Sequence, residues 1–218
     1  YAAEQLARAG IGKLTLVDGD EVKPSNKNRQ LIALDSTIGR RKAEVVRERI
    51  IDINEDISLE VVDAYVKEES LSQLLHAAKY DYVVDAIDTL SPKLQLIRES
   101  LELGIPVVSS MGSGGKTEPW LVREDDISNS YNCRLAAILR KRLHRMGIRK
   151  GFRVVYSPEP VNKEAVVEIV DEPNKKSNTG TISYMPPIFG CFLAGVVIRD
   201  LLGITDTPVG RDGRVAGC

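Results

Sequence analysis

The chain has 218 residues, which fits one large domain or one domain with a small addition. Hydrophobic residues make up 43% and charged residues 28%, a globular composition that excludes a disordered chain. Thirty Lys and Arg face 31 Asp and Glu, so the net charge of −1 excludes the uniformly basic surface of a general nucleic-acid coat.

The first predicted elements are a helix, a glycine turn and a buried strand. Apolar and small residues fall at helical spacing over 1–9, and an apolar run over 13–17 ends in Asp18. The alternation continues, with helices predicted over 41–53, 70–79 and 92–103 and strands over 58–62, 82–86 and 105–110. Strands alternating with helices predict a parallel sheet, and continuous apolar runs predict helices on both faces. The expected fold class is α/β, with a doubly wound, mainly parallel sheet.

The pattern changes after a glycine-rich loop at 112–115. A helix is predicted over 135–146, and strands over 152–156 and 166–170 are expected to form a small antiparallel hairpin. Pro186 and Pro187 then begin an apolar helix that runs to about residue 202. The tail, residues 204–218, has no periodicity and is expected to be disordered.

Cysteine spacing and hydropathy indicate the compartment. Cys133, Cys191 and Cys218 lie far apart without a paired C-x-x-C motif, so neither a disulfide framework nor a thiolate zinc site is predicted. The longest apolar stretch, 188–198, is shorter than the roughly 20 residues that cross a bilayer. We therefore expect a cytoplasmic protein with no membrane anchor.

Acidic residues follow the predicted parallel strands, whose carboxyl ends meet at one edge of the sheet. Asp18 ends the first strand and Asp88 follows a later one. A carboxylate at such an edge accepts hydrogen bonds from the hydroxyls of a nucleotide ribose. A solvated Val-Asp-Gly-Asp turn that includes Asp20 explains the same pattern equally well on position alone.

Phosphate-binding donors follow the first of these carboxylates. The run Ser25-Asn26-Lys27-Asn28-Arg29-Gln30 combines amide and guanidinium groups, and Lys42 lies at the start of the next helix. Arg presents a planar fork to phosphate oxygens and Lys a point charge, which suits a triphosphate. The alternative is an ordinary solvated basic face.

Asp88 has two interpretations. It is a candidate ligand for a magnesium ion that bridges phosphates, because Mg²⁺ takes one or two protein carboxylates and keeps several waters. Alternatively, it belongs to the cap of the helix that follows Thr89, Ser91 and Pro92.

Four motifs in order resemble the adenylating superfamily that includes ThiF, MoeB and the ubiquitin-activating enzymes. They are Leu14-Thr15-Leu16-Val17-Asp18-Gly19-Asp20, Ser25-Asn26-x-x-Arg29-Gln30, Gly39-x-x-Lys42 and Asp85-Ala86-Ile87-Asp88. The resemblance implies a Rossmann-like fold, a homodimer and ATP with Mg²⁺ as cofactors. It places Asp18 on the ribose, Asn26, Arg29 and Lys42 on the phosphates and Asp88 on the magnesium. Asp20, Ser25, Asn28 and Thr89 complete the implied ATP contacts, and Arg29, Lys42 and Asp88 the catalytic set.

Further motifs resemble the branch of the tRNA threonylcarbamoyladenosine dehydratases, the TcdA or CsdL proteins. They are Gly112-x-Gly114-Gly115-Lys116-Thr117-x-Pro119 and the helix that begins Leu135-Ala136. This branch implies ATP-dependent cyclisation of threonylcarbamoyladenosine in tRNA through an acyl-adenylate. The alternative is a ThiF- or MoeB-type activator of a sulfur-carrier or ubiquitin-like protein. Missing C-x-x-C motifs and the absence of cysteine between Ser91 and Asn132 argue against that alternative.

The resemblance also divides the chain. Residues 1–115 correspond to a nucleotide-binding part, whose first strand and Gly-rich phosphate loop are expected upstream of Tyr1. Residues 116–203 correspond to a substrate-binding, C-terminal part of the same domain. The branch is associated with sulfur-relay partners, but the apolar surroundings of Cys191 predict a buried structural cysteine instead.

One segment is strongly basic. Residues 134–153 hold eight Lys and Arg and no acid, which leaves 22 basic against 31 acidic residues elsewhere. This imbalance favours a docked polyanion, and the resemblance implies tRNA, contacted by Arg140, Lys141, Arg142, Arg145, Arg149 and Lys150. A solvated helix against an acidic partner subunit is the alternative.

Two more functions remain open from the residues alone. A nicotinamide oxidoreductase also uses a carboxylate such as Asp18 on a ribose, but it has no evident need for Arg29, Lys42 and Asp88 together. A non-catalytic scaffold is the other, because the expected Gly-rich loop is not among the motifs.

Overall fold

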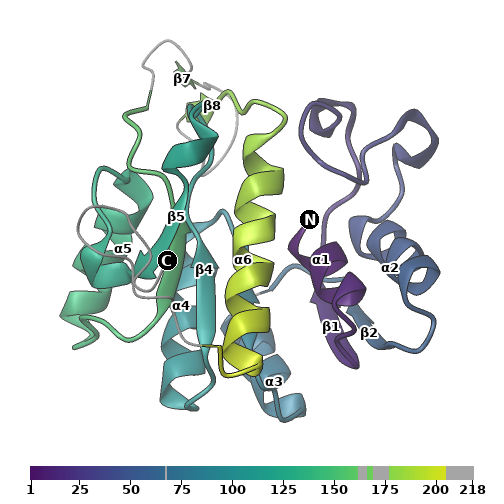
Figure 1. The fold of residues 1–218 in the computed structure, drawn as a ribbon, viewed down its shortest axis with the longest axis horizontal. Helices are drawn as coiled ribbons and strands as arrows, with labels where there is room; N and C mark the ends of the chain where they lie inside the picture. Colours follow the sequence, from purple (N-terminus) through teal and green to yellow (C-terminus); the bar gives the residue numbers. More distant parts are fainter. Residues whose placement is uncertain (67, 162–165, 169–176, 205–218) are drawn as a thin grey trace, which may run out of the picture.

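The computed structural model describes residues 1–66, 68–161, 166–168 and 177–204 (Figure 1). The predicted tail therefore lies outside the described residues from 205 onward, as does the end of the strand predicted over 166–170. No described helix is both long and apolar enough to span a bilayer.

The first part of the chain forms a parallel strand pair covered by two helices. Helix α1 (Ala2–Arg8) leads to β1 (Lys13–Val17), and α2 (Lys42–Ile53) leads to β2 (Ser58–Val62). The strands pair in parallel from Lys13 beside Ser58 to Val17 beside Val62. Both strands have the predicted bounds, because each is a short run of apolar or β-branched residues between turn formers.

A second sheet has the order β3-β4-β6-β5. Its elements, with the helices between them, are α3 (Glu68–Ala77), β3 (Val83–Asp85), α4 (Leu90–Glu102), β4 (Val107–Ser110), β5 (Arg123–Asp126), α5 (Arg134–Arg145) and β6 (Arg153–Tyr156). The first three strands are parallel and β5 is antiparallel to β6. The predicted α/β class with parallel strands is confirmed.

The predicted hairpin of 152–156 with 166–170 is wrong. Strand β6 lies inside the second sheet, between β4 and β5, while β7 (Val166–Glu168) pairs with β8 (Ser177–Thr179). Val154 and Val155 are both fully buried, as expected for an interior strand with apolar side chains on both faces. The edge strand β5 was missed because its sequence, Arg-Glu-Asp-Asp, carries no apolar signal.

Helices cover the second sheet on both faces (Figure 1). Val107 and Val154 pack in one core cluster with α4 and α5. The next residues along each strand, Val108 and Val155, pack in another cluster with the last helix, α6 (Met185–Leu201). This alternation is the period-two pattern of a strand with two buried faces. Four short 3₁₀ turns complete the described elements: η1 (Pro24–Asn26), η2 (Asp35–Thr37), η3 (Pro119–Leu121) and η4 (Ile127–Asn129).

The two sheets are joined by helix packing. Within the described residues, no backbone ladder connects β1 or β2 to the second sheet. Helix α1 packs closely on α6, where a Cβ on Gly190 would lie 2.5 Å from the Cβ of Tyr1. The glycine therefore permits the approach that holds β1 beside the larger sheet.

Candidate active site

The end of β1 carries a half-buried carboxylate. Asp18 accepts a hydrogen bond at Oδ1 from the backbone N–H of Asp20, at 2.8 Å. Burial raises the pKa of Asp18 above its usual value, more than the hydrogen bond and nearby Lys42 lower it. Gly19 lies between them, and a Cβ there would come within 2.5 Å of the backbone nitrogen of Tyr65. Only glycine lets the loop after β1 approach the loop after β2 this closely.

Asp20 and Lys42 form an ion pair beside this carboxylate. Lys42 Nζ lies 2.7 Å from Asp20 Oδ2, and its side chain is only 12% exposed. The Tyr65 hydroxyl donates to Asp20 Oδ1 at 2.8 Å. Burial raises the pKa of Asp20, but the hydrogen bonds from Lys42 and Tyr65 outweigh it and leave the pKa lowered. Asp20 thus stays ionised and holds the Lys42 ammonium at the carboxyl end of β1.

The polar residues in and after η1 have two roles: one shapes the turn, and the others line a cavity. Asn26 is buried and its Oδ1 accepts the Lys23 backbone N–H at 3.0 Å, so this oxygen shapes the turn. Arg29 donates from Nη1 to the Ser25 carbonyl at 3.0 Å and to Asn28 Oδ1 at 2.9 Å. Ser25, Asn28 and Arg29 line a cavity of about 400 Å³.

A segment that the sequence did not indicate closes the other side of this cavity. Residues 179–181 line it, and Asn28 Nδ2 donates to the Thr181 carbonyl at 2.9 Å. Gly115 donates its backbone N–H to the Gly180 carbonyl at 2.8 Å. The segment therefore ties the loop after β1 to the loop after β4. Its Asn-Thr-Gly-Thr sequence is typical of any turn, so only the tertiary contacts reveal its position.

Glu159 orders the loop after β4. Its carboxylate accepts the backbone N–H groups of Thr117 and Glu118 at 2.9 and 3.0 Å, and the Thr117 hydroxyl at 3.0 Å. Burial raises the pKa of Glu159, but these hydrogen bonds leave it lowered. The buried ammonium of Lys116 donates to the Glu159 carbonyl, and burial lowers its pKa. Each backbone group named here has a hydrogen-bond partner. These bonds hold the backbone of the loop next to the cavity in one conformation.

A buried ion pair supports the loop after β3. Asp85 and Lys93 are both fully buried, and Lys93 Nζ lies 2.8 Å from Asp85 Oδ2. Asp85 also accepts the Ser109 hydroxyl at 2.6 Å and the Ile87 backbone N–H at 3.0 Å. Lys93 in turn donates to the Ile87 carbonyl at 3.0 Å. Both backbone groups of Ile87 are therefore fixed by one buried pair.

Asp88 and Thr89 follow this fixed residue at the start of α4. Both are exposed, and Thr89 is the residue before the helix, with no side-chain capping bond. The predicted site residues thus form three groups in and beside the loops that follow β1 and β3: Asp18 with Asp20 and Lys42, Ser25 with Asn28 and Arg29, and Asp88 with Thr89. In the described part of the chain, no three His, Cys, Asp or Glu residues are arranged to hold a metal ion.

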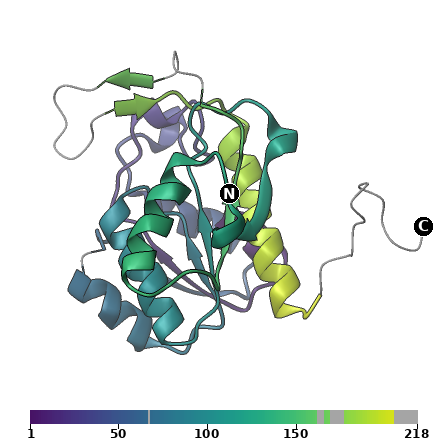
Figure 2. The same cartoon turned by 90° about the vertical axis from the view of Figure 1, so that its left-hand side faces the viewer.

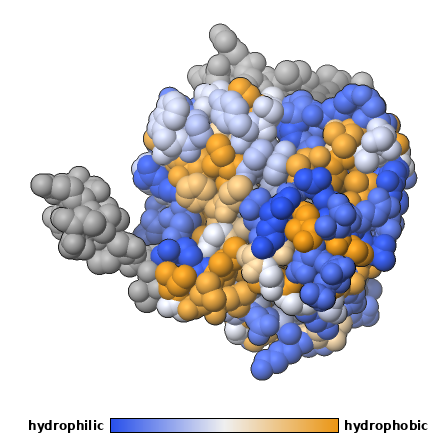
Figure 3. All heavy atoms as spheres, turned by 45° about the vertical axis from the view of Figure 1, so that its right-hand side comes forward, coloured by the Kyte–Doolittle hydropathy of each residue, from blue (hydrophilic) through white to orange (hydrophobic). Residues whose placement is uncertain are grey.

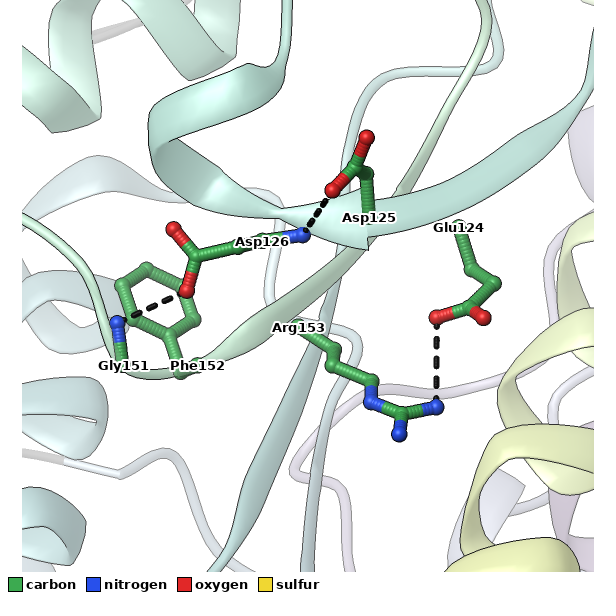
Figure 4. Close-up of a pocket in the computed structure, with 6 residues that line it drawn as sticks. All are labelled: Glu124, Asp125, Asp126, Gly151, Phe152 and Arg153. Carbon is green, nitrogen blue, oxygen red and sulfur yellow. Dashed lines mark hydrogen bonds and ion pairs between the residues drawn. The ribbon is translucent and has the colours of Figure 1, made fainter. Parts of the chain in front are cut away.

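A second cavity, of about 530 Å³, lies at the edge of the second sheet that β5 forms (Figure 4). Its carboxylates are already bonded: Glu124 pairs with Arg153 at 3.4 Å, and Asp126 accepts the Gly151 backbone N–H at 2.7 Å. This cavity lies where the end of β5 meets the start of β6. The loops described above follow the carboxyl ends of the parallel strands, at the other end of the sheet. It holds none of the predicted site residues.

The basic segment covers α5 and the turn after it. Arg140 is half-buried and donates from Nη1 to the Ser130 carbonyl at 2.7 Å, so it anchors the helix to η4. The other predicted basic residues are exposed: Lys141, Arg142, Arg145, Arg149 and Lys150. Figure 2 views the molecule from the side that α5 covers.

The prediction that Cys191 is buried is wrong. Cys191 is exposed, because α6 buries Phe189 and Leu193 against the sheet and turns Cys191 and Phe192 outward. Cys133 is the buried cysteine of the described pair.

The predicted site residues lie in loops that follow the parallel strands β1 and β3. Comparison with known proteins shows the family to which such a chain belongs. A profile of the ThiF family matches residues 1–213. The chain belongs to the ThiF family. Among ThiF-related proteins, it is 36% identical over 209 residues to the tRNA threonylcarbamoyladenosine dehydratase of Bacillus subtilis, covering 93% of this chain and 82% of that protein. It is 29% identical over 166 residues to the sulfur carrier protein ThiS adenylyltransferase of Escherichia coli, covering 71% and 65%.

Solved structures support the same relationship. The E. coli tRNA threonylcarbamoyladenosine dehydratase TcdA, crystallised with AMP, superposes with a TM-score of 0.81 at 34% identity and covers 93% of this chain and 80% of that one. The complex of the same protein with ATP gives a TM-score of 0.81 at 33% identity, with the same coverage. This ThiF-family chain therefore has the Rossmann-like fold that its motifs predict.

Proposed function

We propose that this chain is an ATP-dependent dehydratase that acts on N6-threonylcarbamoyladenosine in tRNA. The observation that carries the proposal is the set of polar groups at the strand ends, in a chain that matches dehydratases over 93% of its length. Similarity to the ThiS adenylyltransferase covers less of the chain, 71%, at lower identity.

The donor set fits ATP. Arg29 is a fork-shaped donor beside the cavity, Ser25 and Asn28 add neutral groups, and Lys42 adds a positive charge. Asp18 has one carboxylate oxygen bonded to the Asp20 backbone, which leaves the other to accept ribose hydroxyls. We therefore assign the ribose to Asp18 and the phosphates to Arg29, Lys42, Ser25 and Asn28. Asn26 and Asp20 act mainly by shaping the turn and holding Lys42.

Asp88 fits a magnesium ion held together with phosphates. Asp88 is exposed in the loop between β3 and α4, and the buried Asp85–Lys93 pair fixes the preceding residue, Ile87. Mg²⁺ commonly takes one or two protein carboxylates and fills its other positions with phosphate and water oxygens. Thr89, next in the chain, lies at the same helix start and is the last assigned ATP contact.

The proposed reaction has two steps. The carboxylate of the threonylcarbamoyl group attacks the α-phosphate of ATP, and pyrophosphate leaves. The adjacent carbamoyl group then attacks the activated carbonyl, the bond to AMP breaks, and the ring closes with the net loss of one water from the nucleoside. Arg29 and Lys42 neutralise charge that develops on the phosphates, so the protein acts by positioning and electrostatics.

Replacement of Asp88 tests the assignment. We expect Asp88→Ala to abolish pyrophosphate release from ATP in the presence of tRNA that carries threonylcarbamoyladenosine. The matched control is Asp56→Ala, an exposed aspartate in the turn before β2, which should retain release. Undiminished release by Asp88→Ala would remove its assigned role.

The basic face of α5 supports tRNA as the partner. Lys141, Arg142 and Arg145 are exposed on the helix, and Arg149 and Lys150 follow it. Contacts of this kind are made to phosphates, so affinity should fall steeply with added salt. Arg140 contributes through its anchoring of the helix.

Exposed apolar residues at the end of α6 support a homodimer. Leu201, Leu202 and Ile204 are 45%, 68% and 46% exposed, and Figure 3 shows apolar atoms gathered around this end of the helix. Burial of such a patch favours self-association. Leu202→Glu should weaken the dimer in light scattering, whereas an unchanged mass would exclude this surface.

A sulfur-relay partner and a cytoplasmic location complete the proposal. Exposed Cys191 is the residue on which a sulfur-relay partner would act. The separated, unpaired cysteines Cys133 and Cys191 fit the reducing cytoplasm.

The second candidate function is activation of a sulfur-carrier protein, which the 29% identity to a ThiS adenylyltransferase favours. ATP–pyrophosphate exchange that requires such a carrier and ignores tRNA would select it.

A further inference from the structure

The single tryptophan of the chain lies on the surface. Trp120, in η3, is 76% exposed, more than any other large hydrophobic residue among those described. Tryptophan is usually well buried, because its ring contributes a large apolar area to a core. Its exposure in a short turn between two ordered segments suggests a ring that a ligand covers.

A second exposed aromatic ring lies close to the same strand. Tyr131 is 47% exposed, and Arg123 at the start of β5 donates to its hydroxyl at 3.0 Å. The guanidinium carbon lies 5.7 Å from the Tyr131 ring centroid, and Tyr156 meets the ring edge-on at 6.0 Å. Tyr131 is therefore held in place while half of it faces solvent.

Tyr131 contacts Arg123 and Trp120 precedes it closely in sequence, so both are connected to the end of the sheet that carries the proposed ATP-binding loops. Strand β5 is antiparallel, so Arg123 lies beside Tyr156, at the carboxyl end of β6. Trp120 is three residues before Arg123, a separation of at most about 11 Å along the chain. Tyr184 donates its hydroxyl to the Thr117 carbonyl at 2.7 Å, which connects this region to the loop after β4.

The basic helix α5 continues from Tyr131. Helix α5 begins at Arg134, three residues after Tyr131, and runs back along the sheet (Figure 2). Arg134, Lys141, Arg142 and Arg145 are all exposed. Exposed rings followed by a basic track are the combination that binds single-stranded nucleic acid, since rings stack on bases and cations contact phosphates.

The three acids of β5 that lie near this path are engaged elsewhere. Glu124 pairs with Arg153 at 3.4 Å, and Asp125 accepts the Asn129 amide at 2.8 Å. Asp126 accepts from the Ser128 and Gly151 backbones. These carboxylates lie along β5 rather than on α5, and α5 itself carries no acid.

We infer that Trp120 and Tyr131 stack on unpaired bases of the RNA substrate, whose backbone then follows the basic face of α5. The inference rests on the proposed function, which supplies RNA as the partner. It names the single-stranded part of that RNA as what this surface binds, and it assigns base stacking to two residues outside the ATP site.

The tryptophan fluorescence of the protein reports on the surroundings of Trp120 alone, because the chain has a single tryptophan. We expect its fluorescence to be quenched in a saturable way by unmodified tRNA and by a single-stranded oligouridylate. Trp120→Ala should weaken binding of both probes about ten-fold, as measured by fluorescence anisotropy of labelled RNA. Trp120→Phe should recover part of the loss, because a smaller ring still stacks. The control, Ile51→Ala, removes an exposed apolar residue of α2 and should leave RNA affinity unchanged.

The outcomes separate this inference from the proposed function. If ATP-dependent dehydration of tRNA fails but Trp120 still reports RNA binding and Trp120→Ala weakens it, the stacking surface stands and the reaction is wrong. If dehydration occurs while Trp120→Ala and Tyr131→Ala bind RNA like the parent protein, the stacking surface is wrong. Fluorescence that changes with protein concentration and ignores RNA would also overturn the inference, since it would identify a contact between protein copies.

Discussion

The Lys93 ammonium lies 2.8 Å from the Asp85 carboxylate, and both side chains are fully buried. Two buried charges are costly to desolvate, so such a pair persists where its hydrogen bonds hold a particular conformation. Here the pair bonds both the N–H and the carbonyl of Ile87. The position of Asp88, the next residue, follows from that arrangement.

Removing one member of this pair should be severely destabilising. Lys93→Met leaves an unpaired buried carboxylate, and we expect a loss of roughly 3 to 5 kcal/mol in the free energy of unfolding. Urea denaturation measures it. The double variant Asp85→Leu/Lys93→Met removes both charges and should recover much of this stability. A double variant as unstable as Lys93→Met would show that packing, and not the lone charge, sets the cost.

The same double variant tests the positioning of Asp88. With stability recovered, pyrophosphate release should require more Mg²⁺ than in the parent protein, because Ile87 is no longer held by the pair. A purely structural pair would leave the Mg²⁺ dependence of the folded variant unchanged.

Gly19 should tolerate no side chain. In Gly19→Ala the new Cβ would lie 2.5 Å from the Tyr65 nitrogen and 2.6 Å from the Ala64 carbonyl carbon, both backbone atoms that cannot rotate away. We expect a loss of about 1 to 3 kcal/mol and weaker ATP binding, because Asp18 and Asp20 flank the displaced residue. Gly12→Ala is the control, since nothing lies within 4 Å of its Cβ. Equal stability of the two variants in thermal unfolding would contradict the close approach.

ATP binding should weaken as pH falls. Burial raises the pKa of Asp18, so its carboxylate is protonated as pH falls, at a pH above the ordinary aspartate value of about 3.9. A protonated Asp18 loses acceptor capacity for ribose hydroxyls. The lowered pKa of Asp20 keeps that residue ionised over the same window. Calorimetric titration of ATP against pH measures the effect. Asp18→Asn should bind ATP weakly and without this dependence; a variant that keeps the parent profile would assign the titration to another group.

The α5 residues should divide into two classes. Lys141→Ala with Arg142→Ala should lower tRNA affinity and reduce its dependence on salt, with unfolding unchanged. Arg140→Ala should lower stability, because the guanidinium is bonded to Ser130. Filter binding at several salt concentrations, together with thermal unfolding, distinguishes them. RNA affinity that falls in Arg140→Ala but stays unchanged in the Lys141→Ala/Arg142→Ala variant would reverse the assignment.

Local pattern was sufficient for much of this fold. The bounds of β1 and β2 follow from short apolar runs between turn formers. The positions of Asp18, directly after β1, and of Asp88, in the loop after β3, follow from the rules of parallel sheets. Tertiary context decided the rest. Strand β5 reads as a polar loop because it is an edge strand, and Lys93 reads as a surface lysine until its pairing with Asp85 is known. The approach of residues 179–181 to Asn28 depends on contacts 153 positions apart in sequence.

The most direct test of the proposed reaction is mass analysis of the tRNA nucleosides after incubation with the protein, ATP and Mg²⁺. The proposal predicts that threonylcarbamoyladenosine loses the mass of one water, with one AMP and one pyrophosphate formed for each nucleoside converted. An unchanged nucleoside, together with adenylation of a sulfur-carrier protein under the same conditions, would contradict it.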